Sequence, residues 1–207
     1  MLRKFILITL SLCLNMHANA DDGSKISYYV DNLLKQSFSI LKDSSESTDQ
    51  KVLKSESLIS ANMDLPWMSK FVLGKYRRTL SPDQLAEFVI LYSDYVVKSY
   101  GNAVKSYQDQ GVKVVSQQAI SPNEFIVKTQ LTRAGSDPLS VDYMVRKFGD
   151  SKFKVFDVVT EGVSLINSHQ AEFTNTISNQ GFDSLITDIK GKLKTLETDG
   201  KYGSRED

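Results

Sequence analysis

Few side chains in this sequence have the types and spacing needed for catalysis or metal binding. The 207 residues contain one cysteine, Cys13, and two histidines, His17 and His169. Cysteine–histidine catalysis needs both residue types in one site, and zinc sites need several such ligands. No G-x-S-x-G motif or glycine-rich phosphate loop accompanies His169. We therefore interpret His169 as a solvated histidine on a helix face, and we expect no catalytic residue, metal or cofactor.

Asp157 and Glu161 are the remaining candidates for acid–base chemistry. They lie near the middle of an apolar stretch, 153–166. A carboxylate at the end of a strand commonly caps the following helix or pairs with a base, and we favour that interpretation. The alternative is an isomerase-like enzyme with a cone-shaped α+β fold, in which Asp157 or Glu161 would project into a cavity with a raised pKa.

The first twenty residues have the three parts of a secretory signal peptide. Arg3 and Lys4 form a positive region, residues 5–14 are apolar, and residues 18–20 read Ala-Asn-Ala. This apolar run is too short for a bilayer, which needs about 20 residues. We predict a signal peptide, 1–20, that is cleaved after Ala20, and export of a mature chain without cysteine.

The charge and composition of the chain limit its class. Lys and Arg total 25, as do Asp and Glu, and the first twenty residues hold two bases and no acid. The mature chain is therefore slightly acidic, and we expect no nucleic-acid partner, because such a protein usually shows a basic face. With 41% apolar and 24% charged residues, we expect one globular domain, 21–197, and a mobile charged tail, 198–207.

Helical periodicity governs the first part of the mature chain. The spacing of apolar residues predicts helices over about 24–42 and 50–60, a short helix from Asp64 to about Gly74, and a long helix over 82–110. Residues 81–84, Ser-Pro-Asp-Gln, form a capping box at the start of the long helix. The tyrosine-rich stripe of this helix is either core or the wall of a ligand cavity.

Alternating periodicity begins after Gly111. It predicts strands over 112–119, 124–133, 139–148 and 152–160, followed by helices over 163–179 and 183–196. The strand 152–160 is apolar on both faces and should be central. The fold class is therefore α+β, with a four-stranded antiparallel curved sheet and N-terminal and C-terminal helices packed over one face, enclosing an apolar cleft.

Several motifs, in order along the chain, resemble those of the MlaC family. This is also called the toluene-tolerance (Ttg2D-like) family of periplasmic phospholipid-binding proteins. The motifs are Asp64 with LGKYR (73–77), TLSPDQLAEF (79–88), FKVFDVV (153–159), EGVSLI (161–166) and GFDSLI (181–186). The resemblance covers nearly the whole mature chain.

The resemblance implies a periplasmic phospholipid shuttle of Gram-negative bacteria, not an enzyme. Its partners would be phospholipid, an inner-membrane ABC transporter complex (MlaFEDB-like) and an outer-membrane lipoprotein–porin complex (MlaA-like), and its role would be to maintain outer-membrane lipid asymmetry. Acyl chains would bind non-covalently, driven by about 0.8 kcal/mol per buried CH₂. We expect a monomer. A hopanoid-specific or other lipid-specific member of the same family is the alternative.

Apolar residues of the helices and the sheet are the expected lipid contacts. They are Trp67, Phe71, Phe88, Tyr92 and Tyr95 from the helices, and Phe125, Val127, Tyr143, Val145 and Val163 from the sheet and its exit. The alternative for each of these residues is that it belongs to the packed hydrophobic core and does not contact lipid. Lys75, Arg77 and Arg78 are expected near the mouth of the cleft. They would contact a lipid headgroup or a partner, unless they form only a solvated basic turn.

Overall fold

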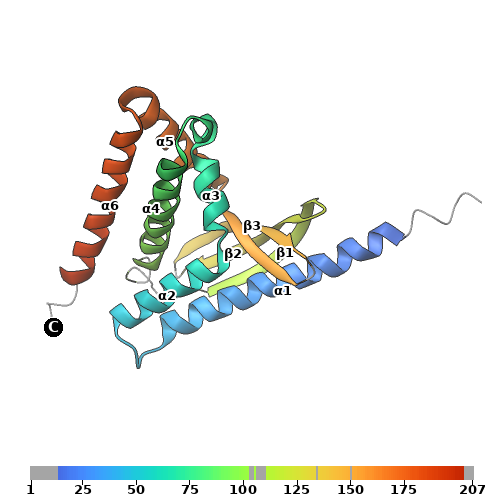
Figure 1. The fold of residues 1–207 in the computed structure, drawn as a ribbon. Coiled ribbons are helices and arrows are strands. Elements are labelled where there is room, and N and C mark those ends of the chain that lie inside the picture. The colour runs from blue at the N-terminus through green and yellow to red at the C-terminus, as the bar shows by residue number, and fades with distance from the viewer. Residues whose placement is uncertain (1–13, 103–104, 106–110, 134, 150, 203–207) are drawn as a thin grey trace, which may run out of the picture.

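A curved antiparallel sheet lies between two groups of helices (Figure 1). The structure, a computed structural model, describes residues 14–102, 105, 111–133, 135–149 and 151–202. The elements are α1 (Leu14–Lys42), α2 (Thr48–Asn62), α3 (Leu65–Val72), the 3₁₀ helix η1 (Gly74–Arg78), α4 (Pro82–Gly101), β1 (Gly111–Ser121), β2 (Glu124–Arg133), β3 (Ser136–Phe148), β4 (Lys152–Thr160), β5 (Val163–Ser164), α5 (Leu165–Gln180) and α6 (Phe182–Tyr202). The predicted α+β class is confirmed.

The prediction of four strands is wrong at the end of the sheet. Within the described residues the sheet has five strands in the order β1-β2-β3-β4-β5, because residues 163–164 pair with 159–160 instead of starting the next helix. Glu161 and Gly162 form the turn, with φ values of 49° and 83°. A two-residue hairpin of this kind requires positive φ at both positions. Apolar periodicity cannot identify so short a strand, which is defined by its partner.

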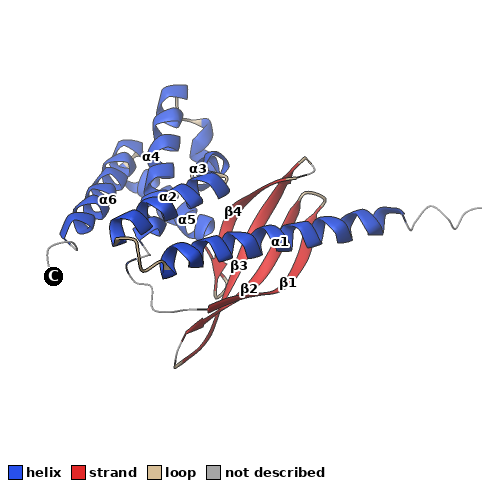
Figure 2. Ribbon diagram, turned by 90° about the horizontal axis from the view of Figure 1, so that it is seen from below, coloured by secondary structure: helices blue, strands red, loops and turns tan. Residues whose placement is uncertain are grey.

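One face of the sheet is covered by α1, which crosses the strands (Figure 2). The buried residues of this core are Ile26, Val30 and Leu34 from α1, and Phe125, Val127, Val145 and Val155 from the sheet. The α1 residues recur every four positions and so lie on one helix face. In β2, the buried residues Phe125 and Val127 alternate with less buried neighbours, as a half-buried strand requires. In β4, by contrast, Val155, Phe156 and Asp157 are all buried, so both faces of this strand are covered.

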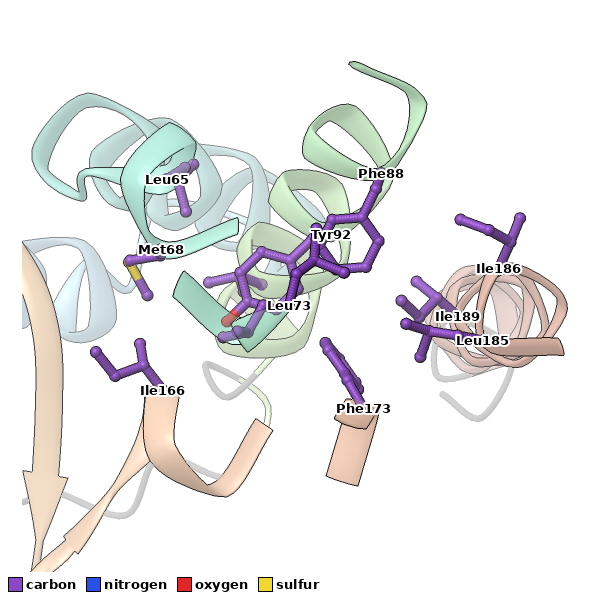
Figure 3. Close-up of a cluster of buried hydrophobic side chains, with 12 residues drawn as sticks. Leu65, Met68, Leu73, Phe88, Tyr92, Ile166, Phe173, Leu185, Ile186 and Ile189 are labelled. Carbon is purple, nitrogen blue, oxygen red and sulfur yellow. The ribbon is translucent and has the colours of Figure 1, made fainter. Parts of the chain in front are cut away.

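A second core, formed by α3 to α6, lies beside the sheet (Figure 3). Its buried residues are Leu65, Met68, Val72 and Leu73 from α3 and its end, Phe88, Tyr92 and Val96 from α4, and Ile166, Phe173, Leu185, Ile186 and Ile189 from α5 and α6. In this core α6 packs on α4 and α5, and α5 also reaches β4. The prediction that the helices pack over one face of the sheet is therefore wrong for α6, because the apolar face of α6 is buried against other helices.

Three helix ends differ from the predictions. α1 begins at Leu14, so residues 14–20 of the expected signal peptide are helical, and 1–13 lie outside the described residues. α4 ends at Gly101, and most of the predicted extension to 110 lies outside the described part. α6 continues to Tyr202, into the expected tail. Apolar spacing marks only the packed turns, whereas backbone hydrogen bonds can extend a helix through polar turns.

The predicted capping box of α4 is confirmed. The Gln84 N–H donates to Ser81 Oγ over 3.2 Å, and the Ser81 N–H donates to Gln84 Oε1 over 2.9 Å. The same reciprocal pair, Ser47 with Gln50, starts α2. Both boxes satisfy N–H groups that a helix leaves without partners in its first turn.

Candidate functional site

The junction between α2 and α3 covers the edge of β4. Met63 makes a parallel bridge with Val155, and the Asp64 N–H donates to the Val155 carbonyl over 2.8 Å. β4 therefore has β3 on one side, and β5 and Met63 on the other. The strand is flanked on both sides, as predicted, although one side is made of two short segments.

An apolar pocket of about 270 Å³ lies between α1, α2 and the sheet. Its lining residues are Leu33, Leu34, Ser37, Leu58, Ile59, Asn62, Met63, Tyr100, Tyr143, Val155, Val158 and Leu165. None of these residues is an acid or a base of the Lys, Arg or His type. The pocket is thus lined by aliphatic and aromatic carbon with a few neutral polar groups, which is typical of sites for apolar ligands.

Tyrosine hydroxyls near this pocket remain protonated. The Tyr29 hydroxyl donates to Asn62 Oδ1 over 3.0 Å, and so links α1 to α2. The Asn62 Nδ2 in turn donates to the Leu58 carbonyl over 2.9 Å. Burial raises the pKa of Tyr29 and that of Tyr143 to about 12. Because both phenols are neutral at pH 7, they add no charge to the pocket.

A second, more open pocket of about 530 Å³ lies against the same α2–α3 junction. Its lining residues are Ser60, Met63, Asp64, Leu65, Pro66, Ser93, Phe148, Lys152 and Lys154. Met63 lines both pockets. This open pocket differs from the apolar one because it carries charged groups: Asp64, Lys152 and Lys154.

Arg146 pairs with the carboxylate of Asp64 at this junction and balances its charge. Its Nη1 lies 3.2 Å from Asp64 Oδ2, and its Nη2 lies 2.9 Å from Glu124 Oε1. The guanidinium carbon lies 4.2 Å from the centre of the Trp67 ring and 4.6 Å from that of Phe156. Arginine suits this position because its planar group stacks on rings while its edge binds carboxylates. Trp67 therefore contacts a half-buried cluster of charged side chains.

The predicted lipid contacts are divided among four places. Phe125, Val127 and Val145 are buried beneath α1, and Phe88, Tyr92 and Tyr95 belong to the helical core or pack against it. Trp67 and Phe71 also pack against the helical core and stack on each other, with 5.1 Å between ring centres. Of the ten predicted residues, Tyr143 alone is among the residues that line the apolar pocket.

Val163, expected at the cavity wall, is instead 64% exposed, because the hairpin of β4 and β5 carries it to the surface.

The remaining pocket residues were not predicted as lipid contacts. Leu33, Leu34 and Ile59 have apolar types at helical spacing, and Val155 and Val158 have the pattern of a strand. These patterns predict burial, but they do not distinguish a pocket wall from a packed core. That distinction depends on which element faces them, and only the packing of α1 and α2 over β4 provides it.

The predicted headgroup contacts lie apart from both pockets. Lys75, Arg77 and Arg78 are exposed in η1. The Lys75 Nζ lies 5.2 Å from the centre of the Tyr76 ring. None of the three is among the residues lining either pocket.

Asp157 is a capping residue, which confirms the favoured interpretation. Its side chain is buried, and its Oδ1 accepts the N–H groups of Ile166, over 3.1 Å, and of Val158, over 2.9 Å. The Ser164 hydroxyl donates to Oδ2 over 2.6 Å. The carboxylate thus satisfies donors at the start of α5. Glu161 is exposed in the neighbouring turn.

His169 is not the solvated histidine that the sequence indicated. It is half-buried, its ring stacks on Phe173, and its Nδ1 shares a hydrogen bond of 2.9 Å with the Tyr92 hydroxyl. Burial lowers the pKa of His169. The prediction was wrong because Tyr92 lies on α4, and no local pattern around His169 reveals its packing.

Within the described part of the chain, no group of three or more His, Cys, Asp or Glu side chains is placed to hold a metal ion. None of its helices combines the length and apolar character needed to cross a bilayer.

The fold and the site define an α+β protein whose helices and sheet border a neutral apolar pocket, with a charged pocket next to it. This chain belongs to the MlaC family, as the resemblance indicated, because the sequence model of that family, described as "MlaC protein", matches residues 31–191.

Known proteins similar to this chain agree with the family. It is 27% identical over 131 residues to the intermembrane phospholipid transport system binding protein MlaC of Haemophilus influenzae, covering 62% of this chain and 61% of that protein. It is 25% identical over 122 residues to the toluene tolerance protein ttg2D of Pseudomonas putida, covering 58% of this chain and 56% of that protein. The matches thus span less than two thirds of either relative.

A solved structure has the same fold. It is the phospholipid-binding protein from Ralstonia solanacearum in complex with a phospholipid, with a TM-score of 0.72 and 19% sequence identity. The similarity covers 83% of this chain and 98% of that one. At this identity the comparison establishes the architecture.

Proposed function

We propose that this protein is a lipid carrier that binds phospholipid without covalent chemistry in the periplasm. The observation that carries the proposal is the neutral apolar pocket between α1, α2 and the sheet. Membership of the MlaC family supports it, as do a relative named for intermembrane phospholipid transport and a structural neighbour named for phospholipid binding. In this role the chain would pass lipid between an outer-membrane lipoprotein–porin complex and an inner-membrane ABC transporter complex.

Burial of acyl carbon supplies the driving force. Each CH₂ group removed from water contributes about 0.8 kcal/mol, so several groups outweigh the cost of ordering the chain. The pocket of about 270 Å³ is at the small end of the usual range for ligand sites, about 300–1,000 Å³. A full acyl chain therefore requires the pocket to widen.

The wall formed by α2 is suited to this movement. None of the residues of α2, all of which are described, is buried. A helix without buried side chains loses little core packing when it shifts. α2 would move away from α1 and β4 as the chain enters, and the Tyr29–Asn62 hydrogen bond would then be strained or broken.

Two alternative functions are a carrier for another lipid and an isomerase-like enzyme. A hopanoid-specific or other lipid-specific member of the family would use the same apolar pocket, and the identity of the bound lipid decides between them. An isomerase-like enzyme would need Asp157 or Glu161 facing a cavity. Asp157 accepts hydrogen bonds from two donors at the start of α5 and from the Val158 N–H of β4, and Glu161 is exposed, which favours the carrier.

The test is a charge placed in the pocket. Leu58 lines the pocket but is not one of the core residues, so Leu58→Glu should leave the fold largely intact. A carboxylate against acyl carbon is unfavourable because it has no partner there. We expect lipid that co-purifies with the protein, measured by mass spectrometry, to fall about tenfold or more.

Leu53→Glu is the matched control. Leu53 lies on the same helix and is 63% exposed. The same substitution there should leave bound lipid unchanged. If Leu58→Glu, folded by circular dichroism, carries as much phospholipid as Leu53→Glu, this pocket does not hold the lipid and the proposal fails.

A further inference from the structure

The two pockets lie on opposite faces of β4 and meet at its edge. Val155 lines the apolar pocket, whereas its neighbour Lys154 lines the open pocket. Successive side chains of a strand point to opposite faces, which explains this separation. The register of β3 and β4 shifts at Phe156, so that Val158 faces the apolar pocket as Val155 does. Met63, at the edge of β4, belongs to both pockets.

A ligand that fills the apolar pocket can therefore extend past one side chain into the open pocket. Methionine is unbranched and flexible, and it adapts its shape to a neighbouring group more readily than other apolar residues do. A long amphipathic molecule fits such a pair of pockets, with its apolar part on one side of Met63 and its polar part on the other.

The charges of the open pocket favour an anion. Asp64 is already paired with Arg146, at 3.2 Å. Lys152 and Lys154 lie on the same face of β4, two positions apart. Among the described residues, no carboxylate lies within ion-pair distance of either lysine. The Lys154 Nζ donates to the Ala61 carbonyl, and an ammonium group has three donors, so it retains capacity for another acceptor.

We propose that Lys152 and Lys154 bind the headgroup phosphate of the lipid, in the open pocket, while an acyl chain occupies the apolar pocket beyond Met63. This inference rests on the proposed function. It moves the headgroup contact away from Lys75, Arg77 and Arg78 of η1. Those residues lie beyond α3, whose eight residues extend over about 12 Å.

The experiment compares two pairs of charge reversals. One variant is Lys152→Glu with Lys154→Glu, and the matched control is Arg77→Glu with Arg78→Glu, which changes the net charge equally. Dissociation constants are measured for phosphatidylglycerol and for diacylglycerol with the same acyl chains, both presented in detergent micelles. Inorganic phosphate is tested separately by ³¹P NMR.

The parent protein should bind phosphatidylglycerol more tightly than diacylglycerol, by about tenfold, because charge-assisted hydrogen bonds are among the strong ones. The lysine variant should lose this preference and keep its affinity for diacylglycerol, and the arginine variant should keep both. Should the glutamates impair folding, Lys152→Gln with Lys154→Gln must lose most of the same preference.

Three results would overturn the inference. The first is a lysine variant, folded and lipid-bound, with the phosphatidylglycerol preference of the parent. The second is a loss of preference in the arginine variant alone. The third is lysine-dependent binding of inorganic phosphate as tight as that of phosphatidylglycerol, which would make the pocket a site for free phosphate. A parent that binds neither lipid contradicts the proposed function itself.

Discussion

The Arg146 guanidinium lies 3.2 Å from the Asp64 carboxylate, which joins the middle of the sheet to the start of α3. The two residues are 82 positions apart in the chain. Their contact fixes the α2–α3 junction against β3, and this junction separates the two pockets. The position of the candidate site therefore depends on a charged pair.

Arg146→Met should destabilise the protein by about 3 kcal/mol, because it leaves the carboxylates of Asp64 and Glu124 without their shared cation. The Arg146 side chain is only 16% exposed, so water at this position would solvate the two carboxylates poorly. Urea unfolding measures the change. Arg146→Lys keeps the charge but loses the stacking on Trp67, and it should be intermediate. A loss below about 0.5 kcal/mol for Arg146→Met would contradict this role.

Acidification should destabilise the protein through His169. Its pKa is lowered by burial from 6.5, so the unfolded chain binds the proton first as the pH falls. The contribution of neutral His169 is fully present above pH 6.5 and is lost as the pH falls toward the lowered pKa of the folded state.

The measurement is thermal unfolding between about pH 5 and 8 for the parent and for His169→Gln. His17 and all carboxylates are common to both proteins, so their effects cancel in the difference. The stability difference should shrink at acidic pH. An equal difference at every pH would show that His169 does not titrate in this range.

Loss of the hydroxyl in Tyr29→Phe should release α2. The hydrogen bond from Tyr29 to Asn62 is 3.0 Å long and links α1 to α2. Its removal should cost about 1 kcal/mol and lower the hydrogen-exchange protection of residues 48–62. Tyr28→Phe is the control, because Tyr28 is 67% exposed on the same helix. Equal protection in the two variants would argue against a link between α1 and α2.

Asp157→Ala should cost about 2 kcal/mol, because it leaves the Ile166 N–H and the Ser164 hydroxyl without their acceptor. Asp157→Asn keeps one acceptor oxygen and should cost less. Chemical denaturation of each variant measures the change in the free energy of unfolding. Glu161→Gln, at an exposed position, should leave that free energy unchanged. If Asp157→Ala is as stable as the parent, the carboxylate does not hold the start of α5.

Asp22→Ala should destabilise the protein by about 1–2 kcal/mol. Asp22 lies 2.6 Å from the Nζ of Lys147, and both side chains are 15% exposed. Asp31→Ala is the control on the same helix, because Asp31 pairs with Lys35 at the surface and should not change stability measurably. The predicted cleavage after Ala20 retains Asp22, so a chain that begins at Asp21 should be as stable as the full chain.

The sequence by itself predicted most of the elements. The strands 124–133 and 152–160 were predicted at their observed bounds, because alternation and turn residues are local properties. The capping box at Ser81 and the capping role of Asp157 could also be predicted, since their partners lie three and nine residues along the chain. The family could be recognised because its motifs occur in order along the chain.

Only the tertiary structure decided which apolar residues line a pocket. Phe125 and Tyr143 occur in similar strand patterns, yet Phe125 is buried beneath α1 and Tyr143 lines the pocket beside it. In the same way, His169 meets Tyr92 from another helix, and Val163 is exposed by a two-residue hairpin. Periodicity reports which face of an element is apolar, but a pocket forms where two such faces meet incompletely, and that depends on how distant segments pack.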